Sequence, residues 1–175
     1  MSIKIAFIGK MCSGKSFICQ YLRSLQPEFE ILSFASKIKD IAIELYGMEY
    51  KDRELLQKIG SKMREIDEDV FSKYLIKESK KYNFVLVDDV RYPNELFYLK
   101  KNGFILVKLV ISSQLQKERL HQLYGNKAEQ HIALLEHSSE ILQDNMDDNL
   151  FDKIINVDNE NVKKLVSELL FQNKV

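Results

Sequence analysis

The chain has 175 residues, the length of one domain with a full hydrophobic core, and we expect residues 1–175 to form a single domain. Its apolar fraction of 45% and charged fraction of 30% are ordinary for a globular protein. The 26 Lys and Arg residues balance the 26 Asp and Glu residues, and the formal net charge is +0. This balance argues against polymeric nucleic acid or a membrane surface as the partner, so we expect a small anionic ligand.

The two cysteines, Cys12 and Cys19, show no metal-ligand spacing, which indicates a reducing, cytoplasmic setting. Because the first strand is expected to begin at residue 3, we expect no signal peptide, and no apolar run approaches the length of a membrane span. The three histidines, His121, His131 and His137, lack the spacing of metal ligands. We therefore expect no histidine metal site.

The first 25 residues predict a strand, a glycine-rich loop and a helix. A short apolar run predicts a buried strand over residues 3–8, and apolar side chains at helical spacing predict a helix over residues 15–25. The segment between them fits the phosphate-binding P-loop pattern G-x-x-x-x-G-K-[ST]. Its residues are Gly9, Lys10, Met11, Cys12, Ser13, Gly14, Lys15 and Ser16.

Each residue type in this loop suits the binding of ATP and Mg²⁺. Gly9 and Gly14 permit backbone angles and close approaches that a Cβ would obstruct, so successive N–H groups can point at phosphate oxygens. The helix that follows aims its positive dipole end at the same anion. We expect Lys15 to reach the β- and γ-phosphates as a catalytic residue, and the Ser16 hydroxyl to hold Mg²⁺. Phe17, which follows directly, completes the expected nucleotide-binding segment.

A helical insert is expected between the second and third strands. The second strand is predicted over residues 30–34, and amphipathic patterns then extend over 38–45, 55–63 and 70–75. These patterns give about fifty helical residues, far more than a simple crossover needs. We interpret residues 35–80 as an insert that binds the phosphoryl acceptor.

The second half continues the alternation of strands and helices. Strands are predicted over 84–87, 104–111 and 153–157, and helices over 93–101 and 162–170. Ser113 and Gln116 resemble a capping box at the start of a further helix. The polar, weakly periodic residues that follow predict a mobile lid within residues 120–150. The whole pattern predicts an α/β protein, a three-layer P-loop NTPase fold with a mostly parallel five-stranded sheet.

Two residues after the third strand are candidates for the same site. Asp88 follows four apolar strand residues, the Walker B pattern, and would hold Mg²⁺ opposite Ser16; the alternative is a carboxylate in a surface turn. Arg91 is a candidate for a bidentate phosphate contact in catalysis. Its alternative role is an ion pair with Asp89 or Glu95.

Phosphoryl transfer depends on positioning and positive charge around the transferring group. Besides Lys15 and Arg91, several cations are available, and composition does not choose among them. These are Lys39, Arg53, Arg64, Arg119 and Lys127.

Five segments together resemble the deoxynucleoside monophosphate kinase family of phages and large DNA viruses. The P-loop is shared by a large superfamily, whereas "LLQKIG" and "DVRYPNE" are more specific. Beside the P-loop, the similar segments are FASKIKDIA at 34–42, KDRELLQKIG at 51–60 with REID at 64–67, VDDVRYPNE at 87–95, and HSSE at 137–140.

The resemblance implies transfer of the ATP γ-phosphoryl group to a deoxynucleoside 5′-monophosphate, with Mg²⁺ as cofactor, by a homodimer. It implies acceptor contacts from Phe34, Lys39, Gln57, Arg64, Asp89 and Arg91. The chain departs from the family pattern within residues 36–38, where Asp and Pro are usual. The lid residues 124–136 also contain no arginine, so Arg119 or Lys127 is expected to supply the catalytic cation there.

Two alternatives stay open. Dephospho-coenzyme A kinase and phosphomevalonate kinase share the architecture but use another small acceptor. A regulatory module that binds a nucleotide and switches a partner is the other alternative, although the sequence has no guanine-specifying N-K-x-D segment.

Overall fold

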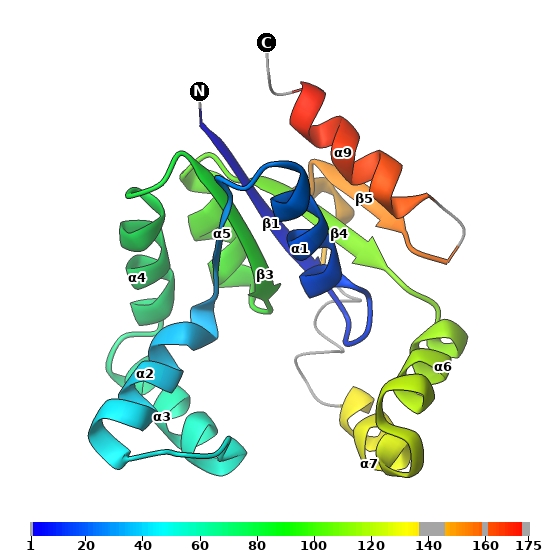
Figure 1. The fold of residues 1–175 in the computed structure, drawn as a ribbon. Coiled ribbons are helices and arrows are strands. Elements are labelled where there is room, and N and C mark those ends of the chain that lie inside the picture. Colours follow the sequence, from blue (N-terminus) through cyan, green and yellow to red (C-terminus); the bar gives the residue numbers. More distant parts are fainter. Residues whose placement is uncertain (1, 137–145, 159–160, 173–175) are drawn as a thin grey trace.

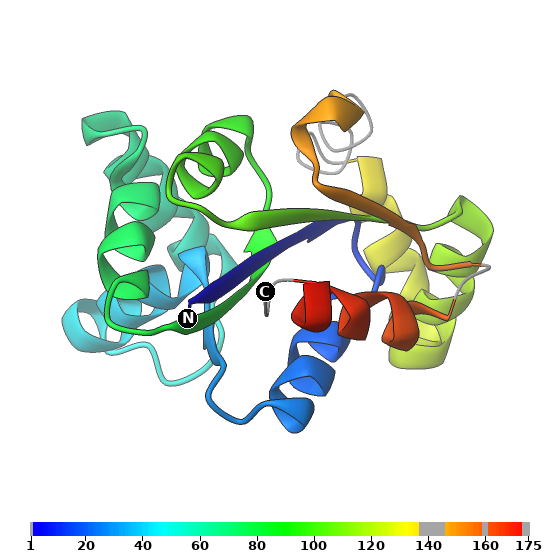
Figure 2. The same cartoon turned by 90° about the horizontal axis from the view of Figure 1, so that it is seen from above.

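The computed structural model describes residues 2–136, 146–158 and 161–172, and consists of one five-stranded sheet between two helical layers (Figure 1, Figure 2). The strand order is β2-β3-β1-β4-β5, and every pair of neighbouring strands is parallel. The three-layer α/β prediction is confirmed, and the sheet is parallel throughout its pairings rather than mostly so. The strands are β1 (Ile3–Gly9), β2 (Glu30–Leu32), β3 (Phe84–Val90), β4 (Ile105–Val110) and β5 (Lys153–Asn156).

Helices connect and cover these strands. The α-helices are α1 (Lys15–Leu25), α2 (Phe34–Tyr46), α3 (Arg53–Ile66), α4 (Val70–Ser79), α5 (Pro93–Lys101), α6 (Ser113–Tyr124), α7 (Ala128–Ile132) and α9 (Val162–Gln172). Short 3₁₀ turns occur at η1 (Gly125–Lys127), η2 (Ala133–Glu136) and η3 (Asp148–Leu150). Among the described residues, none of the helices is both long enough and apolar enough to span a bilayer.

The core lies on both faces of the sheet because consecutive strand residues point to opposite sides. On one face, Phe7 of β1 packs in a cluster with Ile18 of α1 and Val166 of α9. On the other face, Ala6 packs in a cluster with Leu99 of α5. Strands buried on both faces read as continuous apolar runs, which is why the sequence marks β1 and β3 so clearly.

Two pairs of helices extend beyond the edge where the parallel strands end. Helices α2 and α3, the α2–α3 arm, lie on the β2 and β3 side, and α6 and α7, the α6–α7 arm, lie on the other side (Figure 1). The loop between β1 and α1 emerges at the same edge, between the two arms (Figure 1). The fold therefore places the glycine-rich segment between two helical platforms.

Several predicted boundaries are confirmed and others are wrong. The helices predicted over 15–25 and 93–101 begin and end at the predicted residues. The second strand ends at Leu32, because the Ser33 hydroxyl accepts a hydrogen bond from Ala35 N and starts α2. The third strand continues to Val90, so the two aspartates belong to it.

The predicted capping box at Ser113 and Gln116 is also wrong. Ser112 is the N-cap of α6, since its hydroxyl accepts from Leu115 N at 3.2 Å, and the Gln116 side chain has a different partner. Of the predicted lid at 120–150, the structure describes the end of α6, η1, α7, η2 and η3. The HSSE segment with His137 lies outside the described residues.

Candidate active site

The predicted phosphate loop has the backbone of an anion-binding loop. Cys12 and Gly14 have φ values of 63° and 94°, and Ser13 N donates to Lys10 O at 3.1 Å. A Cβ on Gly9 would lie 2.7 Å from the carbonyl oxygen of Leu109, so the close approach of β1 to β4 requires glycine here. Helix α1 begins at Lys15, and its first N–H groups face the loop.

The Lys15 side chain turns back over this loop. Its Nζ donates to the carbonyl oxygens of Gly9 and of Lys10, the latter at 3.0 Å. Its ammonium group is thus held at the place where the motif needs a positive charge against phosphate.

Ser16 and Asp88 form the polar pair beside the loop. The Ser16 hydroxyl donates to Asp88 Oδ2 at 2.6 Å. The contact arises because β1 and β3 are neighbouring parallel strands, so the start of α1 and the end of β3 lie at one edge. A hydroxyl and a carboxylate are oxygen ligands of the kind that Mg²⁺ prefers, and the two groups fit its coordination.

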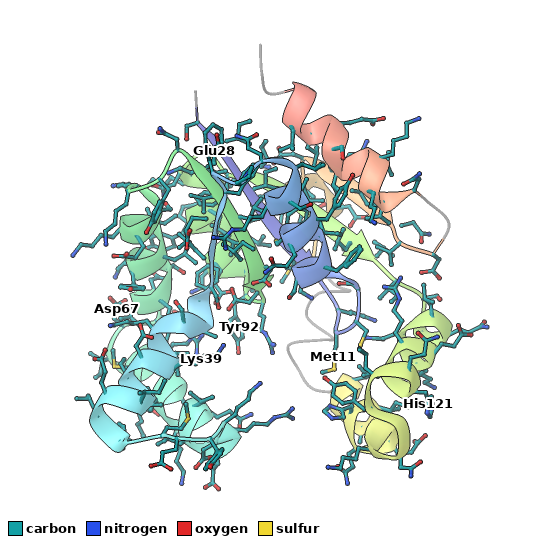
Figure 3. The ribbon with its side chains drawn as sticks, in the orientation of Figure 1. Met11, Glu28, Lys39, Asp67, Tyr92 and His121 are labelled. Atoms are coloured by element: carbon teal, nitrogen blue, oxygen red, sulfur yellow. The ribbon has the colours of Figure 1, made fainter. Side chains whose placement is uncertain are left out.

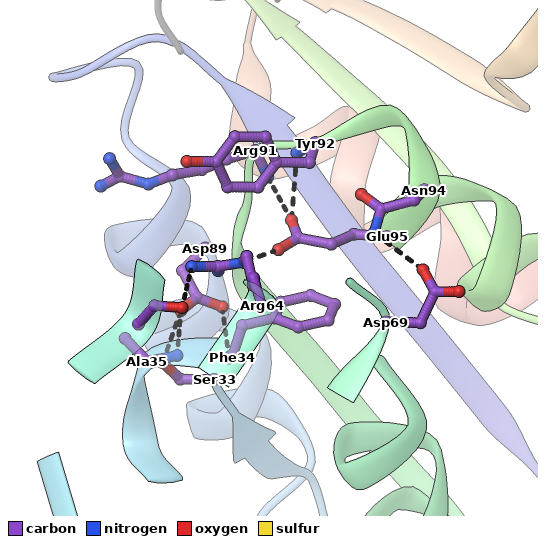
Figure 4. Close-up of polar contacts among 11 residues, drawn as sticks. Ser33, Phe34, Ala35, Arg64, Asp69, Asp89, Arg91, Tyr92, Asn94 and Glu95 are labelled. Atoms are coloured by element: carbon purple, nitrogen blue, oxygen red, sulfur yellow. Dashed lines mark hydrogen bonds and ion pairs between the residues drawn. The ribbon is translucent and has the colours of Figure 1, made fainter. Parts of the chain in front are cut away.

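Asp88 contacts the start of α1, whereas the next residue, Asp89, contacts the start of α2. Its carboxylate accepts hydrogen bonds from Ser33 Oγ at 2.6 Å and from the backbone N–H groups of Phe34 and Ala35, each at 2.9 Å (Figure 4). Burial raises the pKa of Asp89, and these three donors act in the opposite direction. The expected acceptor residue therefore anchors the α2–α3 arm to the sheet.

Glu95 links the β3–α5 turn to α3, and sequence reasoning missed this role. Its Oε2 accepts from Arg91 N at 2.8 Å and Tyr92 N at 3.1 Å, while Oε1 lies 3.9 Å from Arg64 Nη2 (Figure 4). Glu95 is 3% exposed, and burial raises its pKa to about 7. Glutamate two residues after a first-turn proline is a helix-start signal that could have indicated the backbone contacts.

Arg64 of α3 lies beside the β3–α5 turn, which contains Arg91. The Arg64 guanidinium lies between two aromatic rings, 4.8 Å from the centroid of Phe71 and 5.1 Å from that of Tyr92. Arg91 is exposed, and within the described ranges no ion pair joins its guanidinium to Asp89 or Glu95. Two expected acceptor arginines thus share one buried carboxylate, one through its guanidinium and the other through its backbone.

The other expected acceptor residues are less closely grouped. Lys39 of α2 and Gln57 of α3 are exposed, and within the part of the chain that the structure describes neither makes a hydrogen bond or ion pair with Arg64 or Arg91. Figure 3 shows Lys39 on the α2 side and Met11 on the α6 side of the same sheet edge. Phe34, for which the resemblance implies an acceptor contact, is only 3% exposed because its ring packs in the core.

Helix α6 contacts the phosphate loop from the second arm. Arg119 Nη1 donates to Cys12 O at 2.8 Å, which places this expected catalytic cation against the loop. Gln116 Nε2 donates to Met11 O at 2.9 Å, a contact that no local sequence signal indicated.

The remaining candidates lie farther from this group. Phe17 is 61% exposed, and Lys163 Nζ of α9 lies 5.3 Å from its ring centroid, so Phe17 faces α9. Arg53 and Lys127 are exposed at the start of α3 and in η1. The described part of the chain contains no group of three or more His, Cys, Asp or Glu side chains arranged to bind a metal. His131 instead stacks on Tyr124, with ring centroids 3.7 Å apart.

Solved structures of small-molecule kinases share this fold. Shikimate kinase from Acinetobacter baumannii in complex with shikimate is 18% identical with a TM-score of 0.59, covering 100% of this chain and 96% of the other. The Mycobacterium tuberculosis APS kinase in complex with AMPPNP and APS is 13% identical with a TM-score of 0.56, covering 98% and 99%. At these identities the likeness establishes the fold alone.

The tunicamycin resistance protein of Deinococcus radiodurans is similar too, at 13% identity and a TM-score of 0.59, with 100% and 97% of the two chains covered. No curated protein matches the chain in sequence. A family model described as an AAA domain matches residues 5–143, which include the phosphate loop, β3 with its aspartates, and both helical arms. The chain therefore belongs to this AAA domain family, AAA_18.

Proposed function

We propose that the chain is an ATP-dependent phosphotransferase that moves the γ-phosphoryl group of ATP to a deoxynucleoside 5′-monophosphate. The observation that carries the proposal is the 2.6 Å contact between Ser16 and Asp88 next to the P-loop. It joins the two oxygen groups that a P-loop kinase needs for its magnesium. Mg²⁺ held there would neutralise charge on the β- and γ-phosphates of ATP.

The reaction needs no proton acceptor if the nucleophile is a phosphate. An oxygen of the acceptor monophosphate forms the new P–O bond to the γ-phosphorus, the bond from that phosphorus to the β,γ-bridging oxygen breaks, and ADP leaves. A phosphate monoester has a second pKa of about 6, so its oxygen is already ionised at neutral pH. The protein then supplies positioning and positive charge.

The arrangement of carboxylates supports a phosphate acceptor over an alcohol. An alcohol must lose its proton, and a carboxylate within hydrogen-bond reach is the usual base. At the end of β3, the Asp88 carboxylate accepts from Ser16, and that of Asp89 accepts from Ser33 and two backbone N–H groups. On the acceptor side, Arg64 of α3 and Arg91 of the β3–α5 turn instead present two guanidinium groups, which match phosphate in charge and geometry.

Recognition of a deoxynucleoside by this arm rests on the resemblance of segments 34–42, 51–60 and 87–95. Arg64 and Arg91 would bind the acceptor phosphate, and the exposed Gln57 and Lys39 would lie near the base and the phosphate region. An amide such as that of Gln57 offers both a donor and an acceptor to a base edge. Arg119 would add positive charge from the loop side of ATP.

A coupled assay of ADP release tests the proposal. The protein is supplied with ATP and Mg²⁺, and the acceptors are the four common deoxynucleoside monophosphates, dephospho-coenzyme A, phosphomevalonate, shikimate and APS. We expect strong acceleration of ADP release by at least one deoxynucleoside monophosphate, with the diphosphate as product. Acceleration by one of the other acceptors alone would replace the proposed substrate class. Tight ATP binding without turnover on any acceptor would favour a regulatory module.

A further inference from the structure

Helix α6 holds the phosphate loop by two consecutive carbonyl groups. Gln116 donates from Nε2 to Met11 O at 2.9 Å, and Arg119 donates from Nη1 to Cys12 O at 2.8 Å. Gln116 is 2% exposed, so its amide is buried where it meets the loop. A buried amide with a fixed partner orients that partner strongly, because loss of the bond leaves a buried polar group unsatisfied.

The planarity of the peptide bond turns this contact into a constraint on the loop. In a trans peptide the C=O and the following N–H point in opposite directions. With Met11 O held against α6, the N–H of Cys12 must point away from α6. With Cys12 O held in the same way, the N–H of Ser13 is directed into the loop, where it donates to Lys10 O at 3.1 Å.

The loop conformation needs such support. Cys12 has a φ of 63°, a left-handed conformation that is unfavourable for a residue with a Cβ. Surrounding contacts must hold a residue in that conformation. The carbonyls on both sides of the Cys12 Cα, those of Met11 and Cys12 itself, are the ones that α6 binds.

Helix α6 is a rigid support because its start is fixed to the sheet. Ser112 N donates to Asp158 Oδ1 at 3.0 Å, just after β5, and the Ser112 hydroxyl caps the helix. Gln116 lies one turn farther along, and its backbone N donates to Ser112 O at 2.9 Å. Its amide therefore reaches the loop from a fixed point.

We propose that Gln116 is a positioning residue of the phosphate loop, which sets the Met11–Cys12 peptide in the orientation that binds ATP without touching the nucleotide itself. This inference rests on the proposed function, since it assumes that the loop binds ATP. It assigns to Gln116 a role in nucleotide affinity and none in acceptor binding.

The test compares Gln116→Met, Gln116→Glu and the control Gln114→Met in the full chain. Methionine keeps the length of glutamine and removes its donor, whereas glutamate keeps the shape and brings a negative charge to the carbonyl. Gln114 lies on the same helix but is exposed, and among the described residues its amide donates to Glu118 alone, at 3.0 Å. Calorimetric titration with ATP and Mg²⁺ gives the dissociation constant, and steady-state kinetics gives KM for each substrate.

We expect Gln116→Met to weaken ATP binding about tenfold and Gln116→Glu to weaken it further, while the acceptor KM stays within about twofold. Gln114→Met should match the wild type. Equal ATP affinity in Gln116→Met and Gln114→Met would overturn the proposal. Equal increases in both KM values would also overturn it, because they would indicate a general loss of structure.

Amide hydrogen exchange without nucleotide separates this inference from the proposed function. If Gln116 orders the loop, exchange across residues 11–14 should accelerate in Gln116→Met and in Gln116→Glu but not in Gln114→Met. Unchanged exchange in both Gln116 variants would overturn the inference. Failure of the wild type to bind ATP would overturn the proposed function, and exchange would still decide whether Gln116 orders the loop.

Discussion

The Ser16 hydroxyl lies 2.6 Å from Asp88 Oδ2, although 72 residues separate the two in the chain. The pairing of β1 with β3 causes this proximity, because Ala6 lies opposite Val87 and both strands end at the same edge. A helix N-terminus, a hydroxyl and a carboxylate therefore meet beside the phosphate loop. The carboxylate and the hydroxyl oxygen suit a divalent cation, and the positive end of the helix dipole suits the triphosphate that the cation binds.

Asp88→Asn should raise the Mg²⁺ concentration needed for half-maximal activity at least about tenfold. The amide keeps the size of the carboxylate but lacks its charge, so the cation loses its main electrostatic partner. Activity is measured against free Mg²⁺ at saturating ATP. Asp147→Asn, at an exposed cap of η3, is the matched control and should follow the wild type. An unchanged Mg²⁺ requirement in Asp88→Asn would remove Asp88 from the proposed metal site.

Lys15→Ala should lower kcat by at least about 100-fold, because positive charge at the transferring phosphate is lost. The fold should persist, since the ammonium contacts loop carbonyls at a partly exposed site and does not contribute to the core. Circular dichroism and thermal melting check the fold, and the ADP-release assay checks turnover. Full activity in a folded Lys15→Ala variant would exclude the assigned role.

Arg91→Ala should raise the acceptor KM about tenfold or more and leave the KM for ATP nearly unchanged. Arg64→Lys should act in the same direction, because lysine keeps the charge but loses the planar stacking between Phe71 and Tyr92. Arg23→Ala is the control, since Arg23 forms a 3.9 Å surface ion pair with Glu30, far from the arginine pair in sequence. Parallel changes in both KM values would argue against a dedicated acceptor site at these arginines.

Short sequence patterns predicted the parts of this molecule whose structure is set by residues adjacent in the sequence. Gly47 and Gly103 end their helices with φ values of 64° and 75°, and Pro93 begins α5, as their residue types indicate. The P-loop and the apolar run of β3 were visible for the same reason. Each is set by a few consecutive side chains and the backbone conformations that they favour.

Contacts between distant elements were not predictable in this way. Gln116 reaches Met11 across 105 residues, and Asp89 caps α2 across 54 to 56 residues. Both contacts depend on where whole helices dock on the sheet. Phe34 shows the same limit, because the resemblance implies an acceptor contact for this residue, whereas the packing of α2 buries its ring in the core.

Glu95 makes the stability of the protein sensitive to one buried carboxyl group. Burial raises its pKa to about 7 from the 4.5 of an ordinary glutamate, against the opposing effect of the Arg91 and Tyr92 backbone donors and of Arg64. A raised carboxyl pKa means that the folded chain binds more protons than the unfolded chain between these two values. The contribution of Glu95 to stability is therefore fully present below pH 4.5 and is lost as pH rises through about 7.

Glu95→Gln should abolish this loss, which amounts to about 3 kcal/mol across the window. The glutamine oxygen can still accept from the N–H groups of Arg91 and Tyr92, so the turn should remain intact. Urea denaturation at a series of pH values gives the free energy of unfolding of each protein. Relative to the wild type, the free energy of unfolding of Glu95→Gln should increase by about 3 kcal/mol as the pH rises from 4.5 to about 8. Because burial is the main cause, about 0.5 M salt should leave the shift in place. A difference that does not vary with pH would mean that Glu95 titrates alike in the folded and unfolded chains.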